Sequence, residues 1–405
     1  MIDRARFEEY DRALGANAAL LDRAVGEFVA TCDHLSGYAL KSAILQAYQA
    51  VVDRYGSRVA MLACDLYEDV RGQAGELPGY HATTCEPSQE GLLRWDVSHA
   101  LASSDVAASL SASARQRTMA YADETIAQNA RRDPAHPCWA IVPHVGACGW
   151  CVMLGSNGFQ YRSEGSALAS RHPHCTCPVV VDFDTGNPTL EGYDPGAMRR
   201  AYQACRETIE ADAQAKWDRM GPEERKRYSR NGKSPSYDAY LRNRVATEMN
   251  SRDREWLRTG KVPEIRVETG ARPNPSEWGT ARKAAAAGYA VIFRKTRDLE
   301  MLRTSDAFFE SGSGLAPWDF KGPDGNGSQT IYHQLEEAAG QTRNVLIDLA
   351  KAGGRYDDAG YAIERASKFI RYTYGVKSGR DKGKKWRFDE VAILAKDGSL
   401  YKITR

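Results

Sequence analysis

Apolar residues recur at helical spacing through the first third of the chain. Residues 19–35, 42–71 and 104–133 place apolar side chains at intervals of three or four positions, which predicts three amphipathic helices. The third segment begins with a Ser-Asp pair that can cap a helix and ends just before Pro134. We therefore expect residues 1–135 to form a mostly α-helical domain.

From about residue 262 the pattern changes to a helix, three short strands, a second helix and a fourth strand. A Gly/Ser-rich turn separates the second and third strands, and the fourth strand is almost entirely apolar. The segments that predict these elements are 274–295, 306–309, 318–321, 328–341 and 344–349. This order predicts an α/β domain with a mixed central sheet over residues 262–405.

Two carboxylates and one ammonium fall at strand spacing in this domain. Asp319 and Lys321 are two residues apart, so they project from the same face of a strand. A neighbouring strand can bring Asp306 alongside them. Such carboxylates hold hard divalent ions, and the lysine offsets the negative charge that develops at a phosphate. We therefore expect phosphodiester chemistry.

The order of Asp306, Asp319 and Lys321, with Glu277 on the preceding helix, resembles the PD-(D/E)XK nuclease signature. Residues 262–405 also resemble the tRNA nuclease toxin domain of contact-dependent growth inhibition proteins, down to the ending DGSLYKITR. The resemblance implies that the three acids hold Mg²⁺ or Mn²⁺, that the lysine assists attack, and that tRNA is cleaved.

The helix after the acid cluster adds three further candidates. His333 is a candidate proton donor or phosphate contact, with a plain surface position as the alternative. Gln334 and Gln341 are candidate substrate contacts, because the PD-(D/E)XK resemblance implies a Gln on this helix.

A strongly basic stretch lies near the C-terminus. Residues 365–387 contain nine Lys or Arg residues and one acid, with Tyr372, Tyr374 and Trp386 interleaved. Basic groups bind phosphates and aromatic rings stack on unpaired bases, although a solvated surface is the alternative. The residues that we expect to bind substrate are Lys377, Lys384, Lys385 and Arg387.

Cysteine and histidine cluster between residues 136 and 200. Cys148 and Cys151 form a C-x-x-C pair, and a second cluster follows about twenty residues later. Two such clusters favour a tetrahedral structural Zn²⁺ site, with a redox C-x-x-C or disulfides as the alternatives. The candidate ligands of the second cluster are Cys175 and then His172, with Cys177 or His174 as alternates.

The same region carries a second resemblance. A Trp-containing strand, the C-x-x-C, a glycine-bearing turn and the closing H-P-H-C-T-C resemble MuF-like minor head proteins of tailed phages, especially the actinobacterial type. The resemblance covers roughly residues 1–200. It implies a head-morphogenesis component that associates with phage portal or capsid proteins.

Charge and hydropathy place few further limits on function. The net charge is +2, but residues 261–405 contain 25 basic and 19 acidic residues. Residues 201–261 are highly charged, and we expect them to form a helical linker. The chain has no run of eighteen apolar residues and no apolar signal segment near Met1, so we expect no membrane partner and synthesis in the cytoplasm.

These observations combine into one hypothesis and one main alternative, with a nuclease that acts on phage or host DNA during injection as a weaker option. The hypothesis is a phage-head-associated toxin whose C-terminal domain is a metal-dependent endoribonuclease that acts in the cytoplasm of a target cell. A producer of such an enzyme needs a cognate immunity protein. The alternative is a structural minor capsid protein whose C-terminal domain binds nucleic acid without cleaving it.

Overall fold

The computed structural model describes residues 3–160, 175–229, 234–295 and 305–405. The candidate ligands His172 and His174 lie outside the described residues. The chain divides into two compact units, built mainly from residues 1–195 and mainly from residues 196–405. No helix in the described ranges combines the length and apolarity needed to cross a membrane.

The N-terminal unit is mostly helical, as the periodicity predicts. Its helices in the first 135 residues are α1 (Arg4–Thr31), α2 (Gly37–Gln73), α3 (Glu90–Ala100) and α4 (Val106–Arg132). Asp3 and Asp105 cap α1 and α4 by accepting hydrogen bonds from backbone N–H groups in the first turn. Helix α3 was not predicted from the sequence.

Buried ion pairs support the apolar core of this unit. Asp96 on α3 is fully buried and accepts two hydrogen bonds from Arg117 on α4, at 2.7 and 2.8 Å. Asp133, at the end of α4, is buried beside Arg71 of α2, 2.8 Å away. The strands β1 (Cys138–Ile141) and β2 (Val179–Asp182) then form a small antiparallel sheet.

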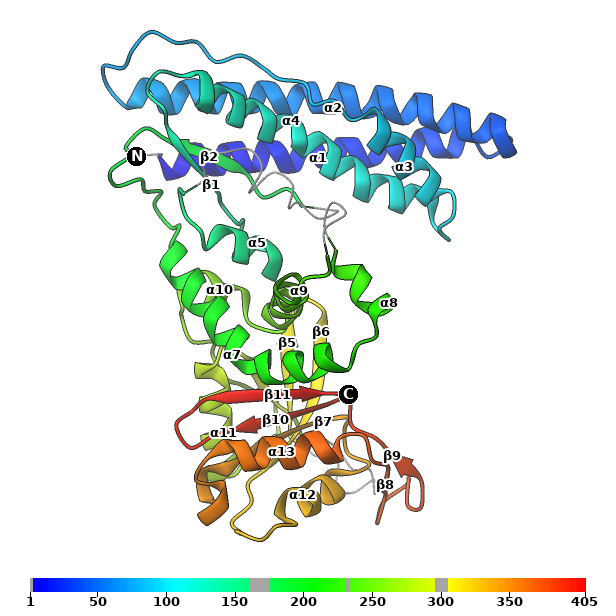
Figure 1. Cartoon of the computed structure of the whole chain (residues 1–405), viewed down its shortest axis with the longest axis vertical. Helices are drawn as coiled ribbons and strands as arrows, with labels where there is room; N and C mark the ends of the chain where they lie inside the picture. Colours follow the sequence, from blue (N-terminus) through cyan, green and yellow to red (C-terminus); the bar gives the residue numbers. More distant parts are fainter. Residues whose placement is uncertain (1–2, 161–174, 230–233, 296–304) are drawn as a thin grey trace. The chain divides into compact units, whose positions relative to one another are not determined.

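The C-terminal unit combines helices with a larger sheet (Figure 1). Its helices are α7 (Pro195–Arg219), α8 (Pro222–Arg225), α9 (Tyr237–Asn250), α10 (Arg254–Thr259), α11 (Pro275–Ala286), α12 (Thr330–Ala338) and α13 (Ala359–Phe369). Its strands are β3 (Arg266–Val267), β4 (Ala290–Phe293), β5 (Ala307–Ser311), β6 (Gly314–Lys321), β7 (Asn344–Asp348), β8 (Tyr374–Gly375), β9 (Lys385–Trp386), β10 (Glu390–Leu394) and β11 (Leu400–Thr404).

Seven of these strands form one mixed sheet in the order β11-β10-β7-β6-β5-β4-β3. The pairs β4/β5, β5/β6 and β10/β11 are antiparallel, whereas β3/β4, β6/β7 and β7/β10 are parallel. The predicted mixed central sheet is therefore confirmed. The sequence α11, β4, β5, β6, α12, β7 also follows the predicted order of a helix, three strands, a helix and a strand.

Alternate residues of the strands pack against different helices. Leu346 of β7 joins the core that α11 covers, together with Trp318 and Phe320 of β6. Val345 and Ile347 join the opposite core, which α12 and α13 cover. Asp319 and Lys321 alternate with Trp318 and Phe320 along β6, so they project toward the α12 face.

Most of the described residues between 201 and 261 lie in helices α7, α8, α9 and α10. Helix α9 buries apolar side chains including Leu241, Val245 and Met249, and α7 buries Ile209 and Trp217. Both helices belong to the same compact unit as the C-terminal sheet. Some of the charged residues in this segment form ion pairs with the sheet, as Glu248 does with Lys402. The proposed domain boundaries at 201 and 261 stay a prediction.

Candidate active site and metal centre

Asp306 and Asp319 are held opposite each other by strand pairing. Ala307 of β5 pairs with Trp318 of β6 in the antiparallel register, so the residues that flank this pair, Asp306 and Asp319, come together. The backbone N–H of Phe320 donates a hydrogen bond of 2.8 Å to Asp306 Oδ2. The predicted neighbouring-strand arrangement is therefore present in the structure.

Lys321 completes the group. Its Nζ lies 2.9 Å from Asp319 Oδ2, and its side chain is 17% exposed. Asp319 itself is fully buried. Despite the nearby ammonium, neither Asp319 oxygen accepts a hydrogen bond of good geometry from the described residues. A buried carboxylate in this condition is a strong acceptor for a cation.

The surroundings disfavour the ionised form of Asp319. Burial, together with the negative charge of Asp306, raises the pKa of this carboxyl to about 8, although the ammonium of Lys321 acts in the opposite direction. A divalent cation beside Asp319 would favour its ionised form.

Glu277 lies at the first turn of α11, where a capping box fixes it. Asn274 accepts hydrogen bonds from the backbone N–H groups of Ser276 and Glu277, and the Glu277 carboxylate accepts one from Asn274 N at 2.8 Å. Burial raises the pKa of Glu277, the negative charge of Asp306 raises it as well, and Lys321 lowers it. The Glu277 carboxyl therefore lies close enough to Asp306 and Lys321 for their charges to act on it.

The three predicted Mg²⁺ ligands are not gathered tightly around one point. Within the described ranges, the ligand atoms of Glu277, Asp306 and Asp319 do not all lie within 4.8 Å of one another. Asp306 and Asp319 are the closer pair, and Glu277 is partly engaged in capping its helix. These residues thus fit a hard cation whose main ligands are the two aspartates.

The candidates on α12 lie in a different local environment. His333 is exposed, and its Nδ1 lies 3.9 Å from Glu336 Oε2. Gln334 is half-buried, while Gln341 lies just beyond the helix and donates to the carbonyl of Glu337 at 3.4 Å. No described contact joins these three side chains to Asp319, so their roles stay predictions.

The basic candidates are exposed around the short β8/β9 hairpin. Lys377 Nζ lies 2.9 Å from Glu336 Oε2, and Lys384 Nζ lies 2.5 Å from Asp381 Oδ1. Arg387 donates to Thr373 Oγ1 at 2.9 Å. Lys385 is exposed on β9. These side chains form a solvent-facing basic surface, which we call the β8/β9 basic surface.

The three interleaved aromatic residues differ in exposure. Tyr372 is 54% exposed and can stack on a base. Tyr374 is 2% exposed and packs against Phe388, while Trp386 donates through its indole N–H to the carbonyl of Thr342 at 3.1 Å. Burial makes Tyr374 a core residue, so the prediction that it contacts bases is not supported by its position.

A second charged group, not predicted from the sequence, lies at the end of β7. Asp348 accepts a hydrogen bond from Thr280 Oγ1 at 2.9 Å, and Lys283 Nζ lies 3.0 Å from its Oδ1. Both partners lie on α11, one and two turns after Glu277. A signal was available, because Asp348 ends an otherwise apolar strand. The group fixes α11 relative to the sheet.

Three cysteines of the N-terminal half form a buried cluster. The Sγ atoms of Cys151, Cys175 and Cys177 lie within 4.8 Å of one another. Cys148 Sγ lies 3.7 Å from Cys151 Sγ. Thiolates at these distances can hold a metal ion such as zinc. Cys148 or a group outside the described residues would supply a fourth ligand.

Loss of one cluster thiol is expected to remove the metal. We expect the purified chain to contain about one Zn²⁺ per molecule. We expect Cys177→Ser to weaken the affinity for Zn²⁺ by at least about tenfold, so that the variant loses the metal. Cys64→Ser, on α2, is the matched control. Elemental analysis after exhaustive dialysis measures the effect. Equal zinc in all three proteins, or none in any, would rule out the site.

Two family models match the chain. A model described as VG15 protein matches residues 1–205, and a model of the contact-dependent growth inhibition CdiA C-terminal domain matches residues 313–400. The second match contains Asp319 and Lys321 but begins after Asp306. No curated protein and no solved structure matches the chain. The first match covers half of the chain and is to a phage-associated family. The chain therefore belongs to the VG15 protein family, and residues 313–400 are similar to the contact-dependent growth inhibition CdiA C-terminal domain.

Proposed function

We propose that the C-terminal unit is a metal-dependent endonuclease that cleaves tRNA. The observation that carries this proposal is the convergence of Asp306, just before β5, with the buried Asp319 and Lys321 on the last residues of β6. Toxin domains of the matched class are typically nucleases, which supports the same reaction.

The order and pairing of the elements support a PD-(D/E)XK-like core. Helix α11 precedes three antiparallel strands, and α12 connects β6 to the parallel strand β7. Asp306 directly precedes the second of these strands, Asp319 lies on the third, and the lysine lies two residues after the second acid. This placement supports the proposed signature.

Each residue of the group has a defined part in the reaction. Asp306 and Asp319 would bind Mg²⁺ or Mn²⁺, with Glu277 as an outer partner, and such an ion supplies Lewis-acid activation of the phosphate. Lys321 stabilises the negative charge that develops on the phosphate oxygens or orients the attacking group. Burial of Asp319 keeps water away from the charged pair and strengthens each of these interactions.

The β8/β9 basic surface is the proposed grip on the RNA backbone. We expect the triple variant Lys384→Ala, Lys385→Ala, Arg387→Ala to weaken tRNA binding by about tenfold at 150 mM salt and to reduce the salt dependence of binding. A control triple variant removes three exposed lysines elsewhere, Lys41, Lys226 and Lys261.

Fluorescence anisotropy with labelled tRNA at several salt concentrations measures both quantities. The catalytic rate at saturating tRNA is expected to change less than threefold, because phosphate contacts of this kind act mainly on binding. Equal weakening by both triple variants would show that only net charge matters and would remove the assignment of this surface.

The phage-associated N-terminal half supports delivery of the toxin with a phage particle. We propose that this half, whose Cys cluster resembles that of MuF-like head proteins, associates with portal or capsid proteins. The nuclease would then act in the cytoplasm of a target cell. A cognate immunity protein would protect the producer by covering the active site or the β8/β9 basic surface.

Controlled expression in bacteria tests the proposed function. We expect the wild-type chain to arrest growth and to generate discrete tRNA fragments on a gel, while plasmid and chromosomal DNA stay intact. Co-expression of the immunity gene from the native locus is expected to restore growth. Unimpaired growth with intact RNA, at a confirmed level of folded protein, would contradict the proposal.

A further inference from the structure

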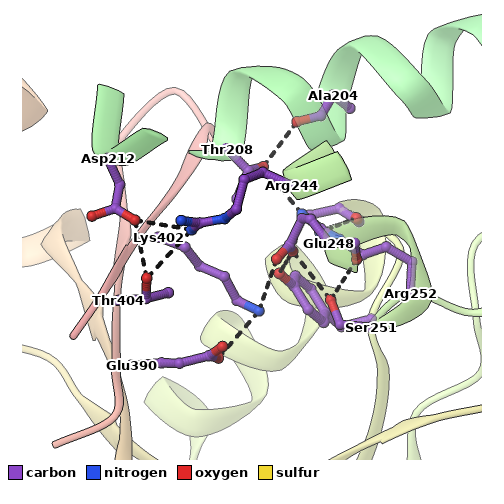
Figure 2. Close-up of polar contacts among 12 residues, drawn as sticks. Ala204, Thr208, Asp212, Arg244, Glu248, Ser251, Arg252, Glu390, Lys402 and Thr404 are labelled. Carbon is purple, nitrogen blue, oxygen red and sulfur yellow. Dashed lines mark hydrogen bonds and ion pairs between the residues drawn. The ribbon is translucent and has the colours of Figure 1, made fainter. Parts of the chain in front are cut away.

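A buried network of charges joins α9 to the last strand of the sheet (Figure 2). Glu248 on α9 is 7% exposed, and its Oε2 lies 3.2 Å from Nζ of Lys402 on β11. Lys402 is 4% exposed and also lies 3.3 Å from Glu390 of β10. Arg252, just after α9, is fully buried and lies 3.0 Å from Glu248 Oε1.

The charges of this network hold one another in the ionised form. Burial alone would lower the pKa of Lys402, but Glu248 keeps it above its ordinary value. Burial alone would raise the pKa of Glu248, but Lys402 and Arg252 keep it below. Removal of one partner would therefore leave an uncompensated charge inside the unit.

Three stacked aromatic rings lie against these charges. Tyr289, just before β4, stacks on Phe309 of β5 with ring centroids 4.6 Å apart, and Phe309 stacks on Trp318 of β6 at 4.9 Å. The ammonium of Lys402 lies 5.3 Å from the Tyr289 ring and 5.4 Å from the Trp318 ring. Arg252 lies 3.9 Å above Tyr289.

This stack lies directly behind the candidate active site. Trp318 pairs with Ala307, and the adjoining residues of the two strands are Asp319 and Asp306. Trp318 belongs to the core on the α11 face, whereas Asp319 projects from the other face. Because Trp318 and Asp319 are neighbours on β6, contacts with the Trp318 ring on one face help to fix the Asp319 carboxylate relative to Asp306 on the other face.

We propose that Lys402 is a positioning residue for the candidate nuclease site. Glu248 holds its ammonium under Trp318, and this contact fixes strand β6 so that Asp319 lies beside Asp306. The proposal rests on the proposed function and extends it to residues 196–250, which would be part of the working toxin rather than a tether.

Helix α7 holds the same strand at its far end. Asp212 Oδ2 accepts a hydrogen bond from Thr404 of β11 at 3.0 Å and from Arg244 of α9 at 3.0 Å (Figure 2). Lys216 donates to the carbonyl of Arg405 at 3.0 Å. Strand β11 is thus fixed to both helices at its end as well as at Lys402.

Hydrogen exchange in the full chain tests the positioning role. We expect Lys402→Met and Glu248→Gln to speed amide exchange in peptides covering residues 307–321 by at least about fivefold. Lys396→Met is the matched control, because Lys396 forms an exposed ion pair with Asp357 at 2.6 Å. The double variant Glu248→Gln, Lys402→Met leaves neither charge of the pair buried and is used if a single variant does not fold.

A kinetic measurement separates positioning from general loosening. For folded Lys402→Met we expect kcat on tRNA to fall by about tenfold or more, with KM within about twofold of wild type. Unchanged exchange in 307–321, with faster exchange only in 390–404, would overturn the positioning role. If the wild-type chain does not cleave RNA, the proposed function fails, and the exchange experiment still decides whether Lys402 orders the acid-bearing strands.

Discussion

Asp319→Asn is expected to lower the rate of tRNA cleavage by at least about 10³-fold. The substitution keeps the shape of the side chain but removes the negative charge that would hold the cation beside Asp306. Lys321→Met is expected to cause a smaller loss, about 10²-fold, because it removes charge stabilisation and leaves the carboxylate pair in place. Initial rates on purified tRNA with saturating Mg²⁺ measure both.

The matched control is Asp324→Asn, which makes the same change at an exposed residue in the segment that follows β6. We expect it to retain wild-type activity, and all variants to retain tRNA binding in the presence of EDTA. If Asp319→Asn cleaved tRNA within tenfold of the wild type, the active site would have to lie elsewhere in the unit.

The same substitution is expected to stabilise the metal-free chain at high pH. The folded-state pKa of Asp319 is raised to about 8, mainly by burial, whereas an unfolded aspartate has a pKa of about 3.9. Below pH 4 the carboxyl is protonated in both states and has no effect. As the pH rises toward 8 the unfolded state ionises first, so the stability of the folded wild-type unit falls. Asparagine does not ionise and escapes this loss.

Thermal and denaturant unfolding between pH 4 and pH 8.5 in EDTA measure the difference. We expect Asp319→Asn to be more stable by up to about 5 kcal/mol at pH 8 and to match the wild type near pH 4. Addition of Mg²⁺ is expected to stabilise the wild type increasingly as pH rises and to leave the variant unchanged. A difference that grows toward low pH would show that the carboxylate is stabilised, not strained, in the folded chain.

The sequence predicts well how Asp306, Asp319 and Lys321 come together, because this arrangement depends on spacing along one hairpin. Asp319 and Lys321 share a face by strand alternation, and the turn between β5 and β6 places Asp306 opposite Asp319. Each of these relations involves residues that are close in sequence or joined by one hairpin. Glu277 was expected on the preceding helix from the resemblance to the PD-(D/E)XK signature.

The buried pair of Glu248 and Lys402, on the other face of the sheet, could not be predicted in this way. Glu248 and Lys402 are 154 residues apart, and their pairing depends on α9 packing behind β11. In the sequence, Glu248 belongs to a charged stretch that predicts solvent exposure, and Lys402 lies in a short C-terminal strand. Their burial follows from tertiary packing alone. The same reason explains why Tyr374 was expected at the surface and lies in the core.

The central claim is that the C-terminal unit cleaves tRNA at the Asp306, Asp319 and Lys321 group with the help of a divalent ion. Its most direct test is gel analysis of total tRNA and plasmid DNA after incubation with the full chain, in Mg²⁺ and in EDTA, for wild type and Asp319→Asn. The account predicts discrete tRNA fragments only with wild type and Mg²⁺. Intact tRNA and DNA in every lane, with nucleic-acid binding retained by both proteins, would contradict it and leave a head protein with a binding domain.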